Sequence, residues 1–408
     1  MSNRRLSICY VVPGHDLLST VGPSRNVINL ARALGEWADV TVAFRRVAEH
    51  RPEGLRVLEI QPGHVAATVD DAAMKGVGYA EFFGYLRDVR SFAQRELPSF
   101  DIVLEKSWLL SGYVSSICNG RGQLGVPIEN IVVNPAHAAG SSIMKRIRLE
   151  AGRWLAGRAL RKAPLVIAET EFLKKEIVRF WGVSEERVAV VDLGVDRELF
   201  HPMEQSIARA RVGISAQPAV ILYVGVLDRT HDLEQVIRAM GGRKPAGVEL
   251  HVVGEGARRI EYETLARECG AAAIFHGRVP HREVPVYISA ADLCIAPYDA
   301  AAFSSGELGY STMKIPEYLS VGRAVASVPS GRIRSLVAQG ETGFLFPNEA
   351  GQWEAFLDAL PGRERLREMG AAAARTRLTS WPDTARQYLS LCEARLAAAG
   401  GGGRAWTR

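Results

Sequence analysis

Residues 311–325 read STMKIPEYLSVGRAV, and this stretch indicates more about the fold than any other of its length. Pro316 has no backbone N–H, so a helix tolerates it only in the first turn, where that donor has no intrahelical partner. We therefore expect a helix to begin near Met313 and to end at Gly322. Residues 324–328, AVASV, follow at once and predict a buried strand.

The predicted helix start is suited to bind an anion. Free backbone amides and the positive end of the helix dipole point into the preceding loop, where Ser311, Thr312 and Met313 lie. Lys314 adds a positive charge there, and Glu317, about one turn further on the same face, can accept hydrogen bonds from a ribose diol. An ordinary amphipathic helix with a surface Lys–Glu pair is the alternative interpretation.

The bulk composition indicates a globular enzyme with two domains. The chain has 408 residues, and single hydrophobic cores stop growing at about 250–300 residues. Its 47% hydrophobic and 23% charged residues are typical of globular enzymes. No apolar run approaches the roughly 20 residues that span a bilayer, and the N-terminal apolar stretch 6–12 is too short for a signal segment. We therefore expect a cytoplasmic protein.

The five cysteines are scattered, odd in number and without any C-x-x-C spacing. This pattern fits neither a zinc site nor a disulfide framework, so we expect reduced and mostly buried thiols. They are Cys9, Cys118, Cys269, Cys294 and Cys392.

The positive charge of the chain is concentrated in one segment. Residues 145–162 carry seven lysines and arginines against Glu150 alone, a net charge of +6, whereas the whole chain carries +5. The rest of the chain is therefore close to neutral, which argues against nucleic acid as a partner.

Apolar residues of the segment 143–162 recur at helical spacing with cations on their flanks. Such a helix suits the surface of an anionic membrane, where each well-placed cation contributes about 1 kcal/mol. That interpretation places the protein peripherally on the inner face of the cell membrane. The equally good alternative is a helix that packs its apolar stripe on the N-terminal sheet. The apolar residues are Met144, Ile147, Ala151, Trp154, Leu155 and Ala159.

Short β-branched runs alternate with helical stretches along the whole chain, the pattern of doubly wound parallel sheets. The pattern occurs twice, with a polar segment between. In the first half we expect strands at 7–12, 40–44, 101–104, 131–133, 166–168 and 188–192, and a helix at 26–34. In the second half we expect strands at 220–224, 248–253, 273–276, 293–296, 324–328 and 343–346, and helices at 233–240, 258–269 and 284–289.

The sequence therefore predicts an α/β fold of two Rossmann-like, doubly wound parallel-sheet domains. Residues 1–196 form the first and 219–380 the second, joined by a structureless linker at 197–218. A last helix at 382–398 precedes the flexible tail 399–408. In such an architecture the carboxyl ends of the strands of both domains face one deep cleft, where the ligand is held.

Several short motifs follow one another in an order that is specific as a set. VGPS at 21–24 follows the first strand, and LGVD at 193–196 with FHP at 200–202 closes the first half. The second half carries YVGVL at 223–227, VVGEG at 252–256, FHGRV at 275–279, ADLCIAP at 291–297, residues 314–322 and GETGFLF at 340–346. Together these motifs resemble the group 1, family 4 glycosyltransferases of GT-B fold over nearly the whole chain.

The resemblance implies different roles for the two domains. The C-terminal domain would bind a nucleotide sugar of the UDP or GDP type. The N-terminal domain, completed by helix 382–398, would bind a glycan, lipid-linked or small-molecule acceptor. Family members mostly retain the anomeric configuration, by same-face attack in which a donor phosphate oxygen helps to deprotonate the acceptor. The chain has no Asp-x-Asp pair, which fits a diphosphate neutralised by amides and cations, so neither a metal nor a cofactor is expected.

Residue roles follow from positions that match the motifs of the family. Glu317 matches the second glutamate of E-x7-E, which holds the ribose at the catalytic centre. The position of the first glutamate is Gly309 here, and Glu307, two residues earlier, is a candidate substitute. Part of the family instead carries Ser-x-x-Lys-x-x-Glu, a pattern that Ser311, Lys314 and Glu317 match.

The largest departure from the family pattern follows the predicted strand 220–224. Members usually carry an Arg and, five residues later, a Lys, which both grip the diphosphate; these positions are Val226 and His231 here. The loss removes two charge-assisted contacts of about 1.5–3 kcal/mol each. We expect Arg229 and His231 in this loop to compensate. The alternative is a weakly active chain or one that depends on a partner.

Further positions match residues of the family's ligand site. His137, after a predicted strand, matches the histidine that contacts the donor sugar; a structural histidine is the alternative. Gly22 matches the turn that lets acceptor and diphosphate approach the backbone, and Gly254 of the VVGEG motif is expected at the donor site. Arg278 and Val279 lie where the nucleotide base would rest.

Two other functions of the same fold are alternatives. A non-catalytic subunit that pairs with another transferase would bind nucleotide without turnover, and a sugar-nucleotide 2-epimerase would need no acceptor. A nicotinamide-dependent dehydrogenase is disfavoured, because Val11-Val12-Pro13-Gly14 is not followed by Gly-x-x-Gly.

Overall fold

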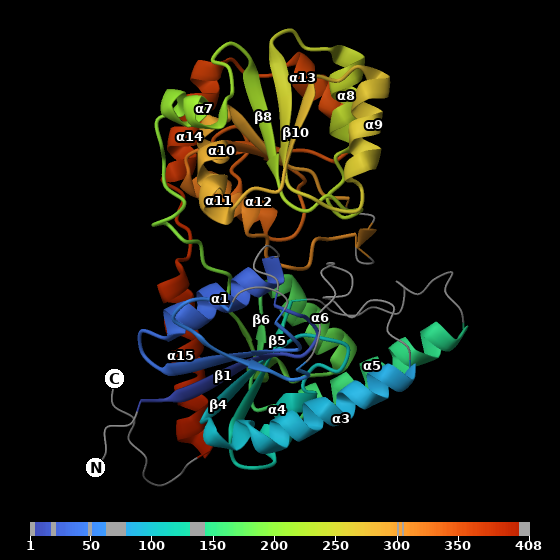
Figure 1. Ribbon diagram of the computed structural model, residues 1–408, viewed down its shortest axis with the longest axis vertical. Coiled ribbons are helices and arrows are strands. Elements are labelled where there is room, and N and C mark those ends of the chain that lie inside the picture. The colour runs from blue at the N-terminus through green and yellow to red at the C-terminus, as the bar shows by residue number, and fades with distance from the viewer. Residues whose placement is uncertain are drawn as a thin grey trace. The chain divides into compact units, whose positions relative to one another are not determined.

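The chain forms two compact units in the computed structural model (Figure 1). The structure describes residues 5–17, 22–47, 51–62, 79–130, 143–299, 302–303 and 306–399. The first unit comprises 1–194, 309–311 and 381–408, and the second comprises 195–308 and 312–380. Each unit contains one parallel sheet with helices on its faces, so the predicted α/β class is confirmed.

The first unit is built on a seven-stranded sheet in the order β3-β2-β1-β4-β5-β6-β7. Strand β1 pairs in parallel with both β2 and β4, so the strand order reverses beside it. Five consecutive residues of β1 are buried, as expected for a parallel strand that is covered on both faces. The strands are β1 (Ser7–Val12), β2 (Asp39–Phe44), β3 (Arg56–Glu59), β4 (Ile102–Lys106), β5 (Leu124–Glu129), β6 (Val166–Ala168) and β7 (Val188–Val190).

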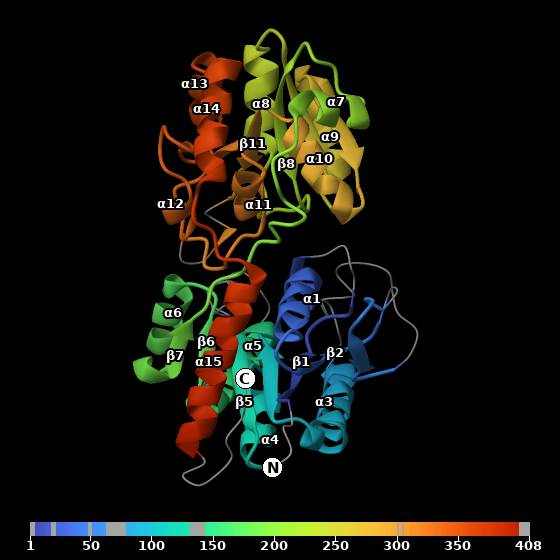
Figure 2. The same cartoon turned by 90° about the vertical axis from the view of Figure 1, so that its left-hand side faces the viewer.

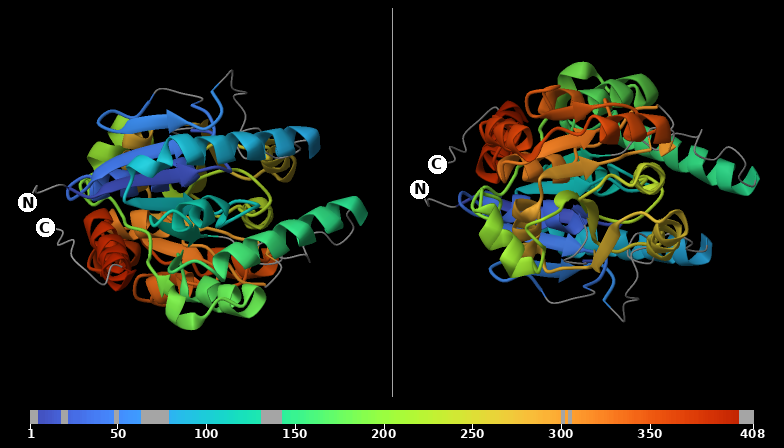
Figure 3. Two further views of the ribbon diagram at one scale, coloured as in Figure 1. Left: turned by 90° about the horizontal axis from the view of Figure 1, so that it is seen from below. Right: turned by 90° about the horizontal axis from the view of Figure 1, so that it is seen from above.

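Helices cover both faces of the first sheet. One layer consists of α3, α4, α5 and α6, with α4 between α3 and α5 (Figure 3). Beneath α3 and α4 lies an apolar core that includes Val11, Phe92 and Val103. Helices α1 and α15 lie side by side, although they come from the two ends of the chain (Figure 2). The helices are α1 (Gly22–Leu34), α3 (Tyr79–Arg95), α4 (Tyr113–Asn119), α5 (Ile143–Leu160), α6 (Glu171–Trp181) and α15 (Trp381–Ala399), with short 3-10 turns at Leu97–Ser99 and Glu185–Arg187.

The second unit is built on a six-stranded sheet in the order β10-β9-β8-β11-β12-β13. Here the strand order reverses beside β8, which pairs in parallel with β9 and, through Leu222 opposite Cys294, with β11. The strands are β8 (Ala219–Val224), β9 (Val248–Val253), β10 (Ala273–Gly277), β11 (Leu293–Ala296), β12 (Ala324–Ser327) and β13 (Gly343–Leu345).

The core of the second unit lies on the sheet face that α8, α9, α13 and α14 cover. It includes Val252 and Ile295 of the sheet and Trp353 of α13. Helices α7 and α10 pack against each other. The helices are α7 (Gln205–Val212), α8 (Glu234–Arg243), α9 (Arg259–Cys269), α10 (Val284–Ala290), α11 (Lys314–Ser320), α12 (Ile333–Leu336), α13 (Ala350–Asp358) and α14 (Arg363–Ala374), with a 3-10 turn at His281–Glu283.

Two strands of the first sheet, β3 and β5, were not predicted. The prediction of a strand at 131–133 lies outside the described residues. Strand β5 precedes it and pairs with β4 and β6. Its sequence, LGVPIE, contains Gly125 and Pro127, which both argue against a central strand, since proline cannot donate to the ladder. Tertiary pairing on both sides overrides that local preference.

The prediction of a structureless linker at 197–218 is wrong, because this segment contains α7 and belongs to the second unit. The Glu204 side chain accepts the backbone N–H of the third residue of α7 at 2.9 Å, and Gly213 ends the helix with φ of 70°. Arg209 contributes to the polar composition of the segment, but its side chain is buried. Its Nη2 lies 2.6 Å from Asp292 Oδ2.

The five cysteines are free, and all except the half-buried Cys269 are buried. None of the helices in the described ranges is long and apolar enough to cross a membrane. Within the same ranges, no three His, Cys, Asp or Glu side chains form a group that could hold a metal ion.

Arg209→Ala is expected to destabilise the second unit by about 3 kcal/mol, because it removes the closest charge partner of the buried Asp292. Urea unfolding followed by circular dichroism measures this change. The matched control is Arg211→Ala, which breaks the exposed pair with Glu283 (2.9 Å) and should cost less than about 1 kcal/mol. Equal losses in the two variants would contradict this role for Arg209.

Candidate active site

Polar and aromatic side chains gather at the carboxyl edge of the second sheet, beside the neighbouring strands β8 and β11. The strand order reverses between these two strands. In open α/β sheets, ligands bind at the carboxyl ends of the strands at such a reversal. The loop after β8 and the start of α11 contribute the side chains described below.

Helix α11 begins where the sequence predicts. Lys314 is its first residue, Met313 precedes it, and Pro316 lies in its first turn, so the predicted helix start near Met313 is confirmed. The backbone N–H of Val224, at the end of β8, donates to the Tyr318 hydroxyl at 2.9 Å. This hydrogen bond fixes α11 against the edge of the sheet.

The ammonium group of Lys314 lies among aromatic rings. Its Nζ donates to the Tyr223 hydroxyl at 3.1 Å and lies 4.4 Å from the centre of that ring and 5.3 Å from the centre of the Tyr298 ring. Such cation–π contacts stabilise a charge that has lost part of its water. No role was predicted for Tyr223, because within AVILYV it reads as one more core residue of the strand. Its polar tip in a buried strand was the signal that could have found it.

Burial lowers the pKa of Lys314 to about 7, against the opposing attraction of Asp228 and Glu317. The group therefore titrates near neutral pH. An anion placed next to it would stabilise the protonated form and raise this pKa.

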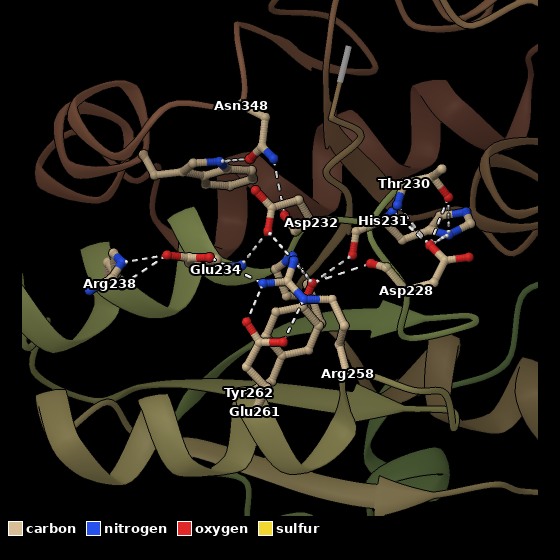
Figure 4. Close-up of polar contacts among 12 residues, drawn as sticks. Asp228, Thr230, His231, Asp232, Glu234, Arg238, Arg258, Glu261, Tyr262 and Asn348 are labelled. Carbon is tan, nitrogen blue, oxygen red and sulfur yellow. Dashed lines mark hydrogen bonds and ion pairs between the residues drawn. The ribbon is translucent and has the colours of Figure 1, made fainter. Parts of the chain in front are cut away.

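His231 has a neutral ring at neutral pH. Burial and the positive charge of Lys314 lower the pKa of His231 to about 4, although Asp228 opposes the shift. The His231 Nδ1 lies 2.9 Å from Asp228 Oδ1, which also accepts the backbone N–H of Thr230 at 2.9 Å (Figure 4). A neutral His231 that donates through Nδ1 orders the loop after β8 and adds no positive charge to it.

Arg258 fixes the following part of the loop after β8 (Figure 4). Its guanidinium lies 3.3 Å from Asp232 and 3.2 Å from Glu234, and hydrogen bonding to Glu261 raises its pKa. It also stacks on the Tyr262 ring at 4.7 Å. The charge of Arg258 is therefore already matched by carboxylates of the protein itself.

Glycines let the loops after β8 and β9 approach each other closely. Gly254 has φ of 141°, and a Cβ at this position would lie 1.8 Å from the Gly225 carbonyl oxygen. A Cβ at Gly256 would lie 2.2 Å from the Leu227 carbonyl oxygen. Gly254, which the sequence predicts at the donor-sugar site, is thus also required for the close packing of these two loops.

Glu317 lies on the first turn of α11 with its side chain 13% exposed. Its Oε1 is 3.8 Å from Nε2 of His281, whose ring packs edge-on against Phe200. Glu317 also attracts the charge of Lys314. The pair that the sequence singled out therefore lies at one place in the second unit.

Glu307, the candidate substitute for the missing glutamate, already has partners within the protein. It accepts the backbone N–H of Gly331 at 2.6 Å and the Ser330 hydroxyl at 3.1 Å. It also pairs with Arg334 at 2.9 Å. These contacts hold the loop after β11 to the start of α12.

Residues 309–311 pack with the first unit rather than the second. The Thr170 hydroxyl donates to the Gly309 carbonyl at 2.6 Å, and the Ser311 hydroxyl donates to Asp192 at 2.8 Å. The backbone of Ser311 also hydrogen-bonds to the buried Glu169 carboxylate. By contrast, Thr312 hydrogen-bonds within the second unit, to the Tyr298 hydroxyl at 2.6 Å.

Of the remaining predicted site residues, Arg229 directly follows Asp228 in the loop after β8, and the others lie after β10, in α1 or outside the described residues. Arg229 and Arg278 are exposed, and Val279 is half-buried. Gly22 is the first residue of α1. His137 lies outside the described residues. The roles assigned to these five residues stay predictions.

The two parallel-sheet units place the chain among proteins of the GT-B glycosyltransferase fold. The structural alignment with sucrose-phosphate synthase from Thermosynechococcus elongatus covers 97% of this chain and 100% of that protein, with a TM-score of 0.75 and 21% sequence identity. The alignment with the structure of Anabaena Alr3699/HepE in complex with UDP and glucose covers 95% of this chain and 99% of that protein, with a TM-score of 0.72 and 16% sequence identity. At these identities the likeness concerns the fold.

Family models match both halves of the sequence. Residues 21–199 match the model described as Glycosyltransferase Family 4, and residues 218–361 match Glycosyl transferases group 1. The chain belongs to the group 1 glycosyltransferases, and it is a glycosyltransferase. Similar proteins include the D-inositol 3-phosphate glycosyltransferases of Nocardioides sp. (25% identical over 90% of this chain and 83% of that protein) and Thermobispora bispora (26% identical over 86% and 84%).

Gly254→Ala is expected to lower the free energy of unfolding by about 3 kcal/mol or more, since the new Cβ would overlap the Gly225 carbonyl. Thermal unfolding of the purified variant tests this. In the control Gly242→Ala, a helical glycine gains a methyl group that meets only the far end of Glu354 at 3.7 Å. That variant should be neutral or up to about 1 kcal/mol more stable, and an equal loss in both would refute the close approach.

Proposed function

We propose that this chain transfers a sugar from a nucleoside diphosphate sugar to a hydroxyl acceptor, with retention of the anomeric configuration and without a metal ion. One observation carries the proposal: Lys314 and Glu317 lie about one turn apart at the start of α11, and the Glu317 carboxylate attracts the charge of the Lys314 ammonium beside the carboxyl end of β8. An ammonium group there matches a diphosphate, and a carboxylate nearby matches a ribose diol.

A UDP-sugar is the preferred donor on this proposal, and a GDP-sugar is the second choice. The support comes from the HepE structures in complex with UDP and with UDP-glucose, which share the fold of this chain. The acceptor class is proposed from the relatives named D-inositol 3-phosphate glycosyltransferase. A phosphorylated cyclitol is therefore the first small-molecule acceptor to test, before glycan and lipid-linked acceptors.

The proposed reaction needs stabilisation of a departing diphosphate more than it needs a protein base. The bond between the anomeric carbon and the phosphate oxygen breaks, and the acceptor oxygen attacks from the same face. The acceptor proton passes to an oxygen of the leaving diphosphate, so the products are the glycoside and the nucleoside diphosphate. Lys314 neutralises the charge that grows on this leaving group, and Glu317 holds the ribose.

A binding screen against UDP-, GDP- and ADP-sugars, followed by a transfer assay with the acceptor panel, tests the function. Proton NMR of the product reports whether the anomeric configuration is retained, and activity in excess chelator reports metal independence. Failure of every nucleotide sugar to bind or to be hydrolysed would refute the proposal. A product of inverted configuration would refute the retaining mechanism alone.

Lys314→Met is expected to weaken UDP-glucose binding by about 10- to 100-fold at neutral pH, because a charge-assisted contact contributes about 1.5–3 kcal/mol. Isothermal titration calorimetry measures the affinity. Lys175→Met, which removes an exposed lysine of α6, is the matched control and should bind like the parent. Unchanged affinity in Lys314→Met would contradict the assigned role.

A non-catalytic subunit is the second candidate function. It is favoured by Val226 and by the neutral ring of His231, which leave two family positions without positive charge. Nucleotide binding without turnover, with activity restored by a second transferase, would select it. Interconversion of UDP-N-acetyl sugars without any acceptor would instead select the 2-epimerase.

We further propose that α5 places the protein on an anionic membrane surface. Its buried side is made of small or aliphatic residues at Gly152, Ala156 and Leu160. Trp154 and Leu155 do not pack on the sheet and are 62% and 47% exposed. The exposed cations Arg158, Arg161 and Lys162 follow within two helical turns. An apolar pair with cations beside it matches a lipid surface that carries negative charge.

Replacing both Trp154 and Leu155 by Ser should weaken binding to vesicles of phosphatidylcholine with phosphatidylglycerol by more than about tenfold, since each buried side chain contributes about 1.5–3 kcal/mol. Co-sedimentation measures this binding. Ile260→Ser, at a residue of α9 that is 78% exposed, is the control and should bind like the parent. Equal binding of the parent to vesicles of phosphatidylcholine alone would contradict the electrostatic part of the proposal.

A further inference from the structure

We propose that Tyr223 is a positioning residue that holds Lys314 in place for the donor diphosphate, and that donor binding takes up a proton from solvent at Lys314. This inference rests on the proposed function of the site, since it assumes that the diphosphate of a nucleotide sugar meets Lys314. It assigns a role to a strand residue that the sequence motifs leave without one.

The hydrogen bonds of the Tyr223 hydroxyl fix its direction. It donates its single hydrogen to the Val226 carbonyl oxygen at 2.6 Å. The oxygen lone pairs are then left to accept from Lys314 Nζ, which lies 3.1 Å away. A hydroxyl that is oriented in this way holds an ammonium group at a defined point, whereas a freely rotating hydroxyl would not.

The ammonium group lies directly over the backbone at the end of β8. A Cβ on Gly225 would come within 2.7 Å of Lys314 Nζ and 2.8 Å of the Tyr223 hydroxyl oxygen. Lys314 thus occupies the space that a side chain at position 225 would take. The usual cations of the family would come from positions 226 and 231, in the loop that starts at this point.

The groups that face Lys314 determine its protonation. Asp228 and Glu317 attract the positive charge, whereas burial beside the rings of Tyr223 and Tyr298 disfavours it more strongly and lowers the pKa of Lys314 to about 7. The neighbouring His231 ring is neutral above about pH 4 and adds no competing charge. At neutral pH roughly half of the free protein molecules therefore carry a proton on the Lys314 amine. A diphosphate binds preferentially to this protonated form.

The sign of the pH dependence follows from this selection. Below about pH 7 the free lysine is already protonated, so binding takes up little. As the pH rises above 7, the free lysine loses its proton, and UDP-glucose binding has to restore it. The affinity should therefore fall about fivefold between pH 7 and 8, and proton uptake should approach one per bound molecule.

Calorimetric titration with UDP-glucose, in buffers of different ionisation enthalpy between about pH 6 and 9, measures affinity and proton uptake together. UDP-glucose is the right probe because its diphosphate diester does not titrate in this range. Tyr223→Phe keeps the ring but removes the hydroxyl acceptor, which should move the midpoint of the affinity profile about one pH unit lower. Its affinity should then be within about twofold of the parent at pH 6 and about tenfold weaker at pH 8.

Two further variants separate positioning from general damage. Lys314→Met should bind without proton uptake and with a flat pH profile. Tyr85→Phe also removes a buried hydroxyl that donates to a backbone carbonyl (Pro13, 2.6 Å), but it lies in the first unit and should leave the profile unchanged.

Three results would distinguish the possible failures. An equal loss of affinity at every pH in Tyr223→Phe would show a merely structural tyrosine and overturn the positioning role. A parent protein that binds UDP-glucose without proton uptake at pH 8 would overturn the proton step. If the parent binds none of UDP-glucose, GDP-mannose and ADP-glucose, the proposed function itself fails.

Discussion

The contact between the Lys314 ammonium and Tyr223 is the constraint on which the carboxyl edge of the second sheet depends. An ammonium group that leaves water loses hydration, and two aromatic faces, one hydroxyl oxygen and the attraction of nearby carboxylates offset part of that loss. The contact also demands space. Gly225 supplies it, because any side chain there would collide with Nζ. The glycine at the end of β8 is thus favoured both by the position of the Lys314 ammonium on α11 and by its own backbone φ of 154°.

The loop after β8 is ordered without the cations that the family usually places there. Asp228 organises its first turn, and Arg258 anchors its later part from the start of α9. Arg258 does not replace the missing cations, since carboxylates of the protein surround its guanidinium. Nor does His231, whose ring is neutral at neutral pH. His231 is therefore not expected to compensate as a cation at neutral pH, whereas Lys314 and the exposed Arg229 of this loop remain as positive groups.

The sequence predicted what depends on local chemistry. Strands of β-branched residues, such as β9, were placed with correct bounds, and the start of α11 followed from Pro316 alone. Predictions failed where distant segments decide the structure. Strand β5 contains Pro127 and is stabilised by pairing with the strands on both sides. Arg209 on α7 is buried because its charge pairs with Asp292, which is distant in sequence. The same limit applies to the site: no local pattern links Tyr223 to Lys314, since the two are distant in sequence and meet only when β8 and α11 share an edge.

On the proposed function, a lysine with a pKa of about 7 suits a site that is first empty and then holds a diphosphate. A permanent charge among aromatic rings would destabilise the unoccupied protein, because a partly buried ion lacks both water and a full counterion. A group with a pKa near 7 avoids most of that penalty by releasing its proton when no anion is present. On the proposed function, Lys314 is fully protonated when the diphosphate is bound. Its positive charge stabilises the leaving group most strongly as the bond to the sugar breaks. An arginine, which remains charged at every relevant pH, would lack this property. On the proposed function, the valine at position 226, where the family pattern has an arginine, and the use of Lys314 are then two parts of one physical arrangement.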